Sequence, residues 1–223
     1  MNFALIGPGQ LGRVIFHAAT GQRLVIGRNA AEAQVVCPNA ELGYSTQLQS
    51  AAQCQIVAVA LPAHACEEVF DSLCSFMPPE SILLNFSTSW DIPKALRERF
   101  PSLYLLDSKV VGSALGMARG MKSLIVLGST DEHTTGKVQM SLPGLTIQMG
   151  DYRLVKKVNT VATKTALAAA LALEKELSEQ GIPSEMVKAA TEGLMPGVLI
   201  SYSQGTLGEF AKSMINTLKN ESR

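Results

Sequence analysis

Short apolar segments recur through the first two thirds of the chain and alternate with longer stretches of mixed polarity. Each apolar segment has three to five residues and is bounded by glycine, proline or polar residues, which is the pattern of a buried strand. The segments predicted as strands are 2–6, 24–26, 56–60, 82–86, 103–106, 124–127 and 145–148. Because buried strands that alternate with helices are typical of parallel sheets, we expect a sheet covered by helices on both faces.

The pattern changes at about residue 150. From Tyr152 to about Glu179 the chain is rich in Ala, Leu, Lys and Glu and contains no Gly or Pro, which predicts one long helix. Pro196-Gly197 and Gly205 are expected to divide the remaining residues into two or three shorter helices.

The predicted architecture is α/β, with a doubly wound, mostly parallel sheet over residues 1–150 and a small all-helical domain over residues 151–223. Hydrophobic residues make up 47% of the chain and charged residues 17%, which is enough for a buried core and too apolar for disorder. The 19 Lys and Arg residues balance the 19 Asp and Glu residues, and neither part of the chain has a large excess. This balance argues against a nucleic-acid partner or an anionic membrane partner.

Cysteine usage and the start of the chain predict a cytoplasmic protein. The four cysteines form no Cys-x-x-Cys pair, so we expect reduced thiols and no metal site. The chain begins without the basic and apolar segments of a secretion signal. Its longest apolar run, around Ala166–Leu173, is far shorter than the roughly 20 residues of a membrane span.

A glycine motif, Gly7-x-Gly9-x-x-Gly12, connects the first predicted strand to the first predicted helix. In dinucleotide-binding folds the first glycine permits a tight turn, the second admits the pyrophosphate, and the third lets the helix pack on the strand. The N-terminus of the helix then offers free N–H groups to the phosphates. The alternative is a glycine turn that serves packing alone. The predicted cofactor contacts in this loop are Gly7, Pro8, Gly9, Gln10, Leu11 and Gly12.

The end of the second predicted strand indicates which dinucleotide binds. NAD-binding domains usually place Asp or Glu there to hold the ribose hydroxyls, whereas this strand ends at Gly27-Arg28-Asn29. The first acidic residue of the chain is Glu32. Because a guanidinium can pair with a 2′-phosphate and stack on adenine, Arg28 and Asn29 are predicted to bind NADP (NADPH) rather than NAD. A solvated loop arginine is the alternative interpretation of Arg28.

Later segments fall in an order typical of one family. They are Ala60-Leu61-Pro62, Asn85-Phe86-Ser87-Thr88, Asp107-Ser108-Lys109-Val110-Val111-Gly112, the segment 116–128, and Lys156-Lys157-Val158-Asn159-Thr160. Together with the glycine loop they resemble the β-hydroxyacid dehydrogenases, within the 6-phosphogluconate dehydrogenase superfamily. Over about residues 1–180 this resemblance implies an N-terminal Rossmann domain followed by a helical domain. The short helical region is nearer in size to that of pyrroline-5-carboxylate reductases and deazaflavin-dependent NADP reductases, which share the fold.

The resemblance also implies roles for residues after the glycine loop. Leu61 and Pro62 would line the ribose and phosphate side of the cofactor. Ser87 and Thr88 would lie near the nicotinamide ribose. Lys156 would be the proton-transfer residue.

The substrate-anchoring loop implied by the resemblance consists of Val111, Gly112 and Ser113, with Thr160 also facing the substrate. Two residues depart from the family pattern, because Val111 replaces the serine that contacts the substrate carboxylate and Thr160 replaces an asparagine. These departures leave open which group would anchor a carboxylate.

A polar stripe opens the long predicted helix. Lys156, Asn159, Thr160 and Thr163 are spaced by three or four residues and therefore share one helix face. Such a stripe lines a wet cleft or faces solvent, and the pattern is compatible with both. By resemblance, Asn159 would orient the substrate or the lysine. A lysine beside an oxidised nicotinamide has the chemistry to give and take a proton.

These features predict an NADP-dependent oxidoreductase that transfers hydride between nicotinamide and a small hydroxy acid, keto acid or related carbonyl compound. One alternative is an imine reductase of the pyrroline-5-carboxylate reductase type, which does not rely on a catalytic lysine. Another is a non-catalytic NADP-binding sensor. The apolar segment 193–202 predicts a homodimer formed through the helical domain. The other expected partner is the small-molecule substrate.

Overall fold

The computed structural model of the chain describes residues 1–129 and 131–221. It contains two compact units, Met1–Thr160 and Val161–Arg223. The division falls inside the long helix α7 (Arg153–Glu179), so the start of this helix belongs to the first unit.

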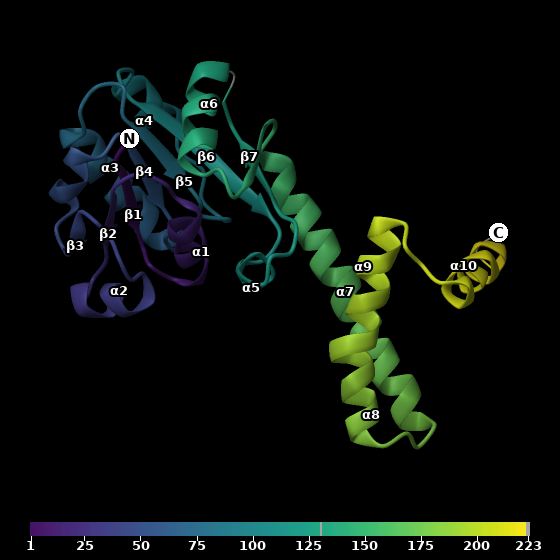
Figure 1. Cartoon of the computed structure of the whole chain (residues 1–223). Coiled ribbons are helices and arrows are strands. Elements are labelled where there is room, and N and C mark those ends of the chain that lie inside the picture. The colour runs from purple at the N-terminus through teal and green to yellow at the C-terminus, as the bar shows by residue number, and fades with distance from the viewer. Residues whose placement is uncertain (130, 222–223) are drawn as a thin grey trace. The chain divides into compact units, whose positions relative to one another are not determined.

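The first unit is built on an eight-stranded sheet, within the part of the chain that the structure describes (Figure 1). The strand order is β3-β2-β1-β4-β5-β6-β7-β8. Neighbouring strands are parallel except for β6 and β7, which are antiparallel. The strands are β1 (Phe3–Ile6), β2 (Arg23–Ile26), β3 (Gly43–Ser45), β4 (Ile56–Val59), β5 (Ile82–Asn85), β6 (Tyr104–Val111), β7 (Leu124–Leu127) and β8 (Thr146–Met149). The prediction of a mostly parallel, doubly wound sheet is confirmed.

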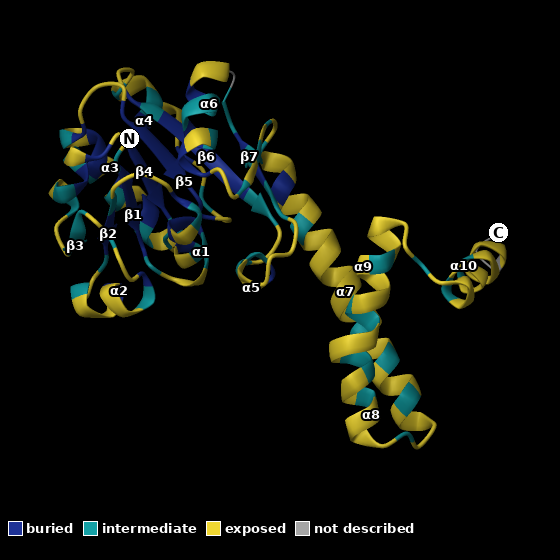
Figure 2. Ribbon diagram, in the orientation of Figure 1, coloured by how far each residue is buried: buried dark blue, intermediate teal, exposed yellow. Residues whose placement is uncertain are grey.

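Helices cover both faces of this sheet and create two apolar cores. Every residue of β1, β4 and β5 is buried (Figure 2). Successive apolar residues of these strands alternate between the two cores, as side chains of a strand must. Leu5 packs with Phe16 on one face, and Val57 packs with Phe70 on the other. The helical segments of the first unit are α1 (Gln10–Ala18), α2 (Ala30–Val36), the 3-10 helix η1 (Leu48–Gln53), α3 (Ala63–Phe76), α4 (Lys94–Arg99), α5 (Ala114–Ala118) and α6 (Glu132–Ser141).

Two strands differ from the sequence prediction. The short edge strand β3 was not predicted, because its Gly-Tyr-Ser sequence has no apolar run. Strand β6 continues to Val111, beyond the predicted end at residue 106. The extension pairs with β7, where Val110 faces Ile125 and Val111 faces Leu124. Val111 is therefore the last residue of a strand rather than part of a loop.

The second unit contains the rest of α7 followed by α8 (Ser184–Ala189), a π-helical segment η2 (Ala190–Leu194), α9 (Met195–Gln204) and α10 (Glu209–Glu221). The all-helical prediction is confirmed, and Gly205 ends α9 in the left-handed conformation with φ 69°. A new helix, α9, begins at the predicted break Pro196-Gly197, although no loop precedes it. Pro196 lies in the first positions of α9, where its missing N–H is tolerated, and the π-helical segment connects α9 to α8.

Burial differs sharply between the two units. No residue of 161–220 is buried, whereas the sheet of the first unit is buried throughout its centre (Figure 2). Within the described residues, no helix has both the length and the apolarity that a membrane span would need.

Candidate functional site

The glycine loop joins β1 to α1 at the carboxyl edge of the sheet. Gly7 has φ +91°, and a Cβ there would lie 2.6 Å from the carbonyl oxygen of Ala60. A Cβ on Gly12 would overlap the carbonyl oxygen of Gly7. The chain's own packing therefore explains why glycine occupies both positions.

Gly9 is different, because the fold itself does not require glycine there. Its backbone is extended, with φ −75° and ψ −168°, and a Cβ would meet no described protein atom within 4 Å. Gly9 is exposed and is the N-cap of α1, which has no side-chain cap and no acidic residue in its first turn. The first N–H groups of a helix lack partners inside the helix and favour anions. This side of the loop has the form of a phosphate cradle.

The other residues of the loop are arranged around this cradle. Pro8 is half-buried, and its ring lies close to Gly27 at the end of β2. Gln10 and Leu11 form the first turn of α1, Gln10 exposed and Leu11 half-buried. The structure thus brings the ends of β1 and β2 together beside the N-terminus of α1.

At the end of β2, Arg28 and Asn29 have different roles. The Oδ1 atom of Asn29 accepts hydrogen bonds from the N–H groups of Ala31 (3.0 Å) and Glu32 (3.3 Å), so this side chain caps α2. Arg28 is exposed and forms no hydrogen bond or ion pair with another described residue. Among the described residues, the whole Arg28 guanidinium is free, whereas Asn29 uses its Oδ1 atom in the cap and keeps only its Nδ2 group free.

The end of β4 lies next to the glycine loop, and the end of β5 lies one strand further along the same edge of the sheet. The side chain of Leu61 approaches Gly7, and Pro62 is the exposed N-cap of α3. Ser87 is buried and Thr88 is exposed. Of the two residues predicted near the nicotinamide ribose, Thr88 is therefore the one with its side chain accessible.

A buried ionic cluster lies directly beneath residues 87–92. The Asp107 carboxylate is fully buried and accepts hydrogen bonds from Asn85 Nδ2 (2.6 Å) and from an Arg97 guanidinium nitrogen (2.7 Å). The Lys109 Nζ atom lies 3.2 Å from Asp107 and 3.0 Å from the exposed Asp91. Sequence reasoning assigned no role to this cluster. Asp107 and Lys109 lie beyond residue 106, where the predicted strand ended, so the sequence pattern did not show that they share a face of a buried strand and must be paired.

The residues predicted to hold substrate are mostly engaged in local structure. The Ser113 hydroxyl caps α5 by accepting a hydrogen bond from the Gly116 N–H (3.0 Å). The Thr160 hydroxyl donates to the carbonyl oxygen of Lys156 (2.7 Å) in its own helix. Gly112 has φ +142°, and a Cβ there would lie 3.0 Å from the Cβ of Ser123. The half-buried Val111 therefore remains as an apolar surface at this point.

The start of α7 lies against the end of β6. Asn159 Nδ2 donates a hydrogen bond of 2.8 Å to the carbonyl oxygen of Val110, and Val155 is buried. The Tyr152 ring lies so close to Gly128 that a Cβ there would come within 2.5 Å of it. Burial, together with the negative charges of Asp107 and Asp91, raises the pKa of Tyr152. Lys156 is exposed and has no side-chain partner among the described residues.

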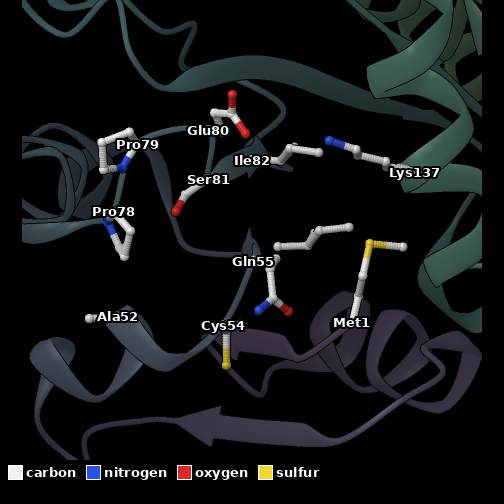
Figure 3. A pocket seen from close by; sticks show the side chains of 11 residues that line it. Met1, Ala52, Cys54, Gln55, Pro78, Pro79, Glu80, Ser81, Ile82 and Lys137 are labelled. Carbon is white, nitrogen blue, oxygen red and sulfur yellow. The ribbon is translucent and has the colours of Figure 1, made fainter.

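Two hollows lie in the described part of the first unit, and the second of them reaches the glycine loop. One, lined by Met1, Gln55, Glu80 and Lys137, opens at the amino ends of β1, β4 and β5 (Figure 3). Ligands of doubly wound sheets bind at the opposite, carboxyl edge. The other hollow lies between α1 and α5 and reaches Gln10 at the glycine loop.

No protein-family model matches the sequence, and no curated protein sequence matches it. Solved structures do match. The chain is similar to the pyrroline-5-carboxylate reductase of Coxiella burnetii, with 12% identity and a TM-score of 0.72 over 99% of this chain and 91% of that one. A Plasmodium falciparum pyrroline carboxylate reductase with NADP bound has 12% identity and a TM-score of 0.66, covering 100% of this chain and 90% of that one.

The 3-hydroxyisobutyrate dehydrogenase of Salmonella typhimurium is also similar, with 19% identity and a TM-score of 0.65 over 92% of this chain and 79% of that one. At these identities the likeness concerns the fold. The chain has the fold of these dehydrogenases and reductases, a Rossmann-like sheet followed by helices, as the sequence resemblance implied.

Proposed function

We propose that this chain is an NADPH-dependent oxidoreductase that transfers hydride between nicotinamide and a small hydroxy acid, keto acid or related carbonyl compound. The observation that carries the proposal is Gly9, whose missing side chain serves no packing purpose and lies at the uncapped N-terminus of α1. The likeness in fold to an NADP-bound reductase supports the same cofactor. Residues 1–150 would bind the cofactor, and residues 151–223 would complete the substrate site and form the dimer.

We assign residues at the carboxyl edge of the sheet to each part of the cofactor. The loop Gly7–Gly12 and the first N–H groups of α1 would hold the diphosphate. Arg28 would pair with the 2′-phosphate, since its guanidinium is exposed and free of other partners. Leu61 would line the ribose and phosphate side of the cofactor, and Thr88 would lie near the nicotinamide ribose. When bound, NADPH supplies the hydride.

Lys156 is the group we assign to proton transfer, because it is exposed and unpaired at the start of α7. It would protonate the oxygen of a carbonyl substrate during reduction and accept the hydroxyl proton in the reverse direction. Asn159 would act as a positioning residue, since its side chain holds α7 against the carbonyl oxygen of Val110.

Reduction of a cyclic imine is the second candidate. One observation favours it: the hydroxyls of Ser113 and Thr160 are engaged in local structure, and Val111 is apolar. The Thr160 hydroxyl donates its proton within its own helix and Val111 has none to give, so only the Ser113 O–H is left to anchor a substrate carboxylate, whereas an imine ring can pack on an apolar surface. The likeness to two pyrroline carboxylate reductases supports this alternative.

A homodimer formed through the helical domain is part of the proposal. Residues 161–220 include no buried side chain, and Leu167, Leu171, Leu194 and Leu199 are more than half exposed. A helical unit without a buried core is not stable alone, and a second copy would cover these faces. Light scattering on the purified protein tests this, because a monomer at micromolar concentration would contradict it.

A reducing cytoplasm suits this protein, since all four cysteines are free and buried. The balanced charge supports a small-molecule substrate rather than nucleic acid or a membrane as partner.

Cofactor binding is the first experiment, and the single tryptophan, Trp90, provides the signal. Titration with NADPH and, separately, NADH should quench Trp90 saturably, with NADPH binding more tightly. The Arg28→Gln variant should lose that preference and keep its NADH affinity. Equal affinity of the wild-type protein for both nucleotides would remove the role of Arg28. Absence of binding in both fluorescence and calorimetry would refute the proposed function.

Turnover then separates the candidates. A panel of hydroxy acids, aldehydes and cyclic imines should reveal a substrate, and its chemical class chooses between the carbonyl and imine reactions. NADPH binding without turnover on the whole panel would favour the non-catalytic sensor.

A further inference from the structure

The segment between β5 and α4 carries Thr88, the accessible residue at the proposed nicotinamide end. Residues Ser87–Asp91 are called the 87–91 loop. Both ends of this loop are attached to buried side chains of β5 and β6. Asn85 accepts a hydrogen bond from the Ser87 N–H (3.0 Å) and donates to the Trp90 carbonyl oxygen (2.8 Å). The N–H of Ile92, which follows the loop, lies 3.3 Å from both carboxylate oxygens of Asp107.

Lys109 makes the most direct attachment. Its Nζ atom donates hydrogen bonds of 2.5 Å to the carbonyl oxygens of Ser87 and Trp90, one near each end of the loop. The same nitrogen lies within 3.2 Å of the carboxylates of Asp91 and Asp107. An ammonium has three protons, so these four oxygens use its full capacity. The side chain is only 4% exposed, which means that Lys109 is committed to this loop and does not act on solvent or substrate.

The charges of the cluster are balanced. Lys109 and Arg97 face Asp107 and Asp91, two positive groups against two negative groups. Lys109 is also two residues before Val111 and shares its face of β6. One buried cation therefore lies below the 87–91 loop and beside the end of β6 predicted to face substrate.

We propose that Lys109 is a positioning residue that holds the 87–91 loop in its cofactor-binding conformation before the cofactor arrives. The inference rests on the proposed function and adds a residue to its site. A loop that is already ordered binds the cofactor more tightly, because its conformational entropy is not lost on binding. Loss of the attachment should weaken NADPH binding by about 10- to 100-fold, because the residues of the loop must then be ordered when the cofactor binds.

The wild-type protein provides the first test. In the cofactor-free state, the amides of Ser87 and Ile92 should be protected from hydrogen exchange, and NADPH should change this protection little. Exchange at unstructured rates that slows only when NADPH is added would overturn the proposal, because the cofactor rather than Lys109 would then order the loop.

Variants give the second test. Lys109→Met leaves a buried carboxylate with one partner fewer, so a loss of stability is expected as well as a loss of affinity. The double variant Lys109→Met/Asp107→Asn removes one positive and one negative charge and should recover most of the thermal stability. NADPH affinity should stay reduced in the double variant, and the Ser87 amide should exchange faster. Recovery of both stability and affinity would mean that Lys109 has a structural role only.

A matched control distinguishes loss of the buried ionic cluster from the loss of any lysine charge. Lys94→Met removes the same charge from α4, where the side chain is 87% exposed, and should leave stability and NADPH affinity unchanged. The wild-type titration distinguishes the two proposals. If the wild-type protein does not bind NADPH, the proposed function fails; if it binds and Lys109→Met/Asp107→Asn binds equally well, only the role of Lys109 fails.

Discussion

Replacing Gly9 by alanine separates cofactor binding from folding, because the fold does not use the missing side chain. The backbone is extended, and a Cβ would meet no described protein atom within 4 Å. Alanine is a poorer N-cap than glycine, which costs at most about 1 kcal/mol. For a chain of this size, the thermal midpoint should fall by no more than about 2–4 °C. Gly9→Ser, which supplies a capping hydroxyl, should be at least as stable as the wild-type protein.

The added atoms should obstruct a diphosphate that approaches the N-terminus of α1. A hydrogen bond to a charged group contributes about 1.5–3 kcal/mol, so the loss of one such bond weakens binding by about 10- to 100-fold. Trp90 quenching by NADPH measures this loss, and calorimetry checks it independently of the fluorophore. Wild-type affinity in both Gly9→Ala and Gly9→Ser would refute the assignment of this loop as the phosphate site.

Two other glycines of the first unit serve as controls with opposite expectations. Gly12→Ala places a Cβ on the carbonyl oxygen of Gly7 and should lower the thermal midpoint with or without ligand. Gly136 lies within α6, and a Cβ there would meet no described atom within 4 Å. Gly136→Ala should therefore stabilise the protein by about 0.5–1 kcal/mol and leave NADPH affinity unchanged.

Three further predictions follow from the chemistry of single groups. Lys156→Ala should keep NADPH affinity and lower kcat by about 10²–10⁴-fold on a carbonyl substrate, and wild-type turnover would instead favour the imine reaction. The Arg23 guanidinium lowers the pKa of Glu41 to about 2, below its ordinary value of 4.5. Glu41→Gln should therefore lower the free energy of unfolding at pH 7, by about 1 kcal/mol or less because the pair is exposed. In urea titrations, this difference from the wild-type protein should disappear as the pH falls from about 4.5 to 2. Burial raises the pKa of the thiols of Cys37, Cys54 and Cys74 to about 11. A disulfide reagent at pH 8 should therefore label these thiols only after unfolding. Rapid labelling of the native protein would contradict their burial.

Much of the fold could be predicted because local patterns are sufficient for it. Apolar runs identified seven of the eight strands, and a stretch without Gly or Pro predicted α7. The glycine motif placed the candidate phosphate site, since its residues are contiguous and their spacing is tied to one turn geometry. The edge strand β3 was missed because three half-buried residues carry no periodic signal.

The candidate site depends on contacts between residues that are distant in sequence. Only the tertiary structure decided these contacts. Lys109 meets Ser87 across 22 positions, and Asn159 meets Val110 across 49. Sequence spacing cannot say that a hydroxyl caps its own helix, as that of Ser113 does, because the competing partners are chosen during packing. By itself the sequence determined seven of the eight described strands, the long helix and the glycine loop, each of which depends on neighbouring residues. The tertiary structure decided which polar groups stay free, because a buried charge or hydroxyl takes the nearest partner that folding brings to it.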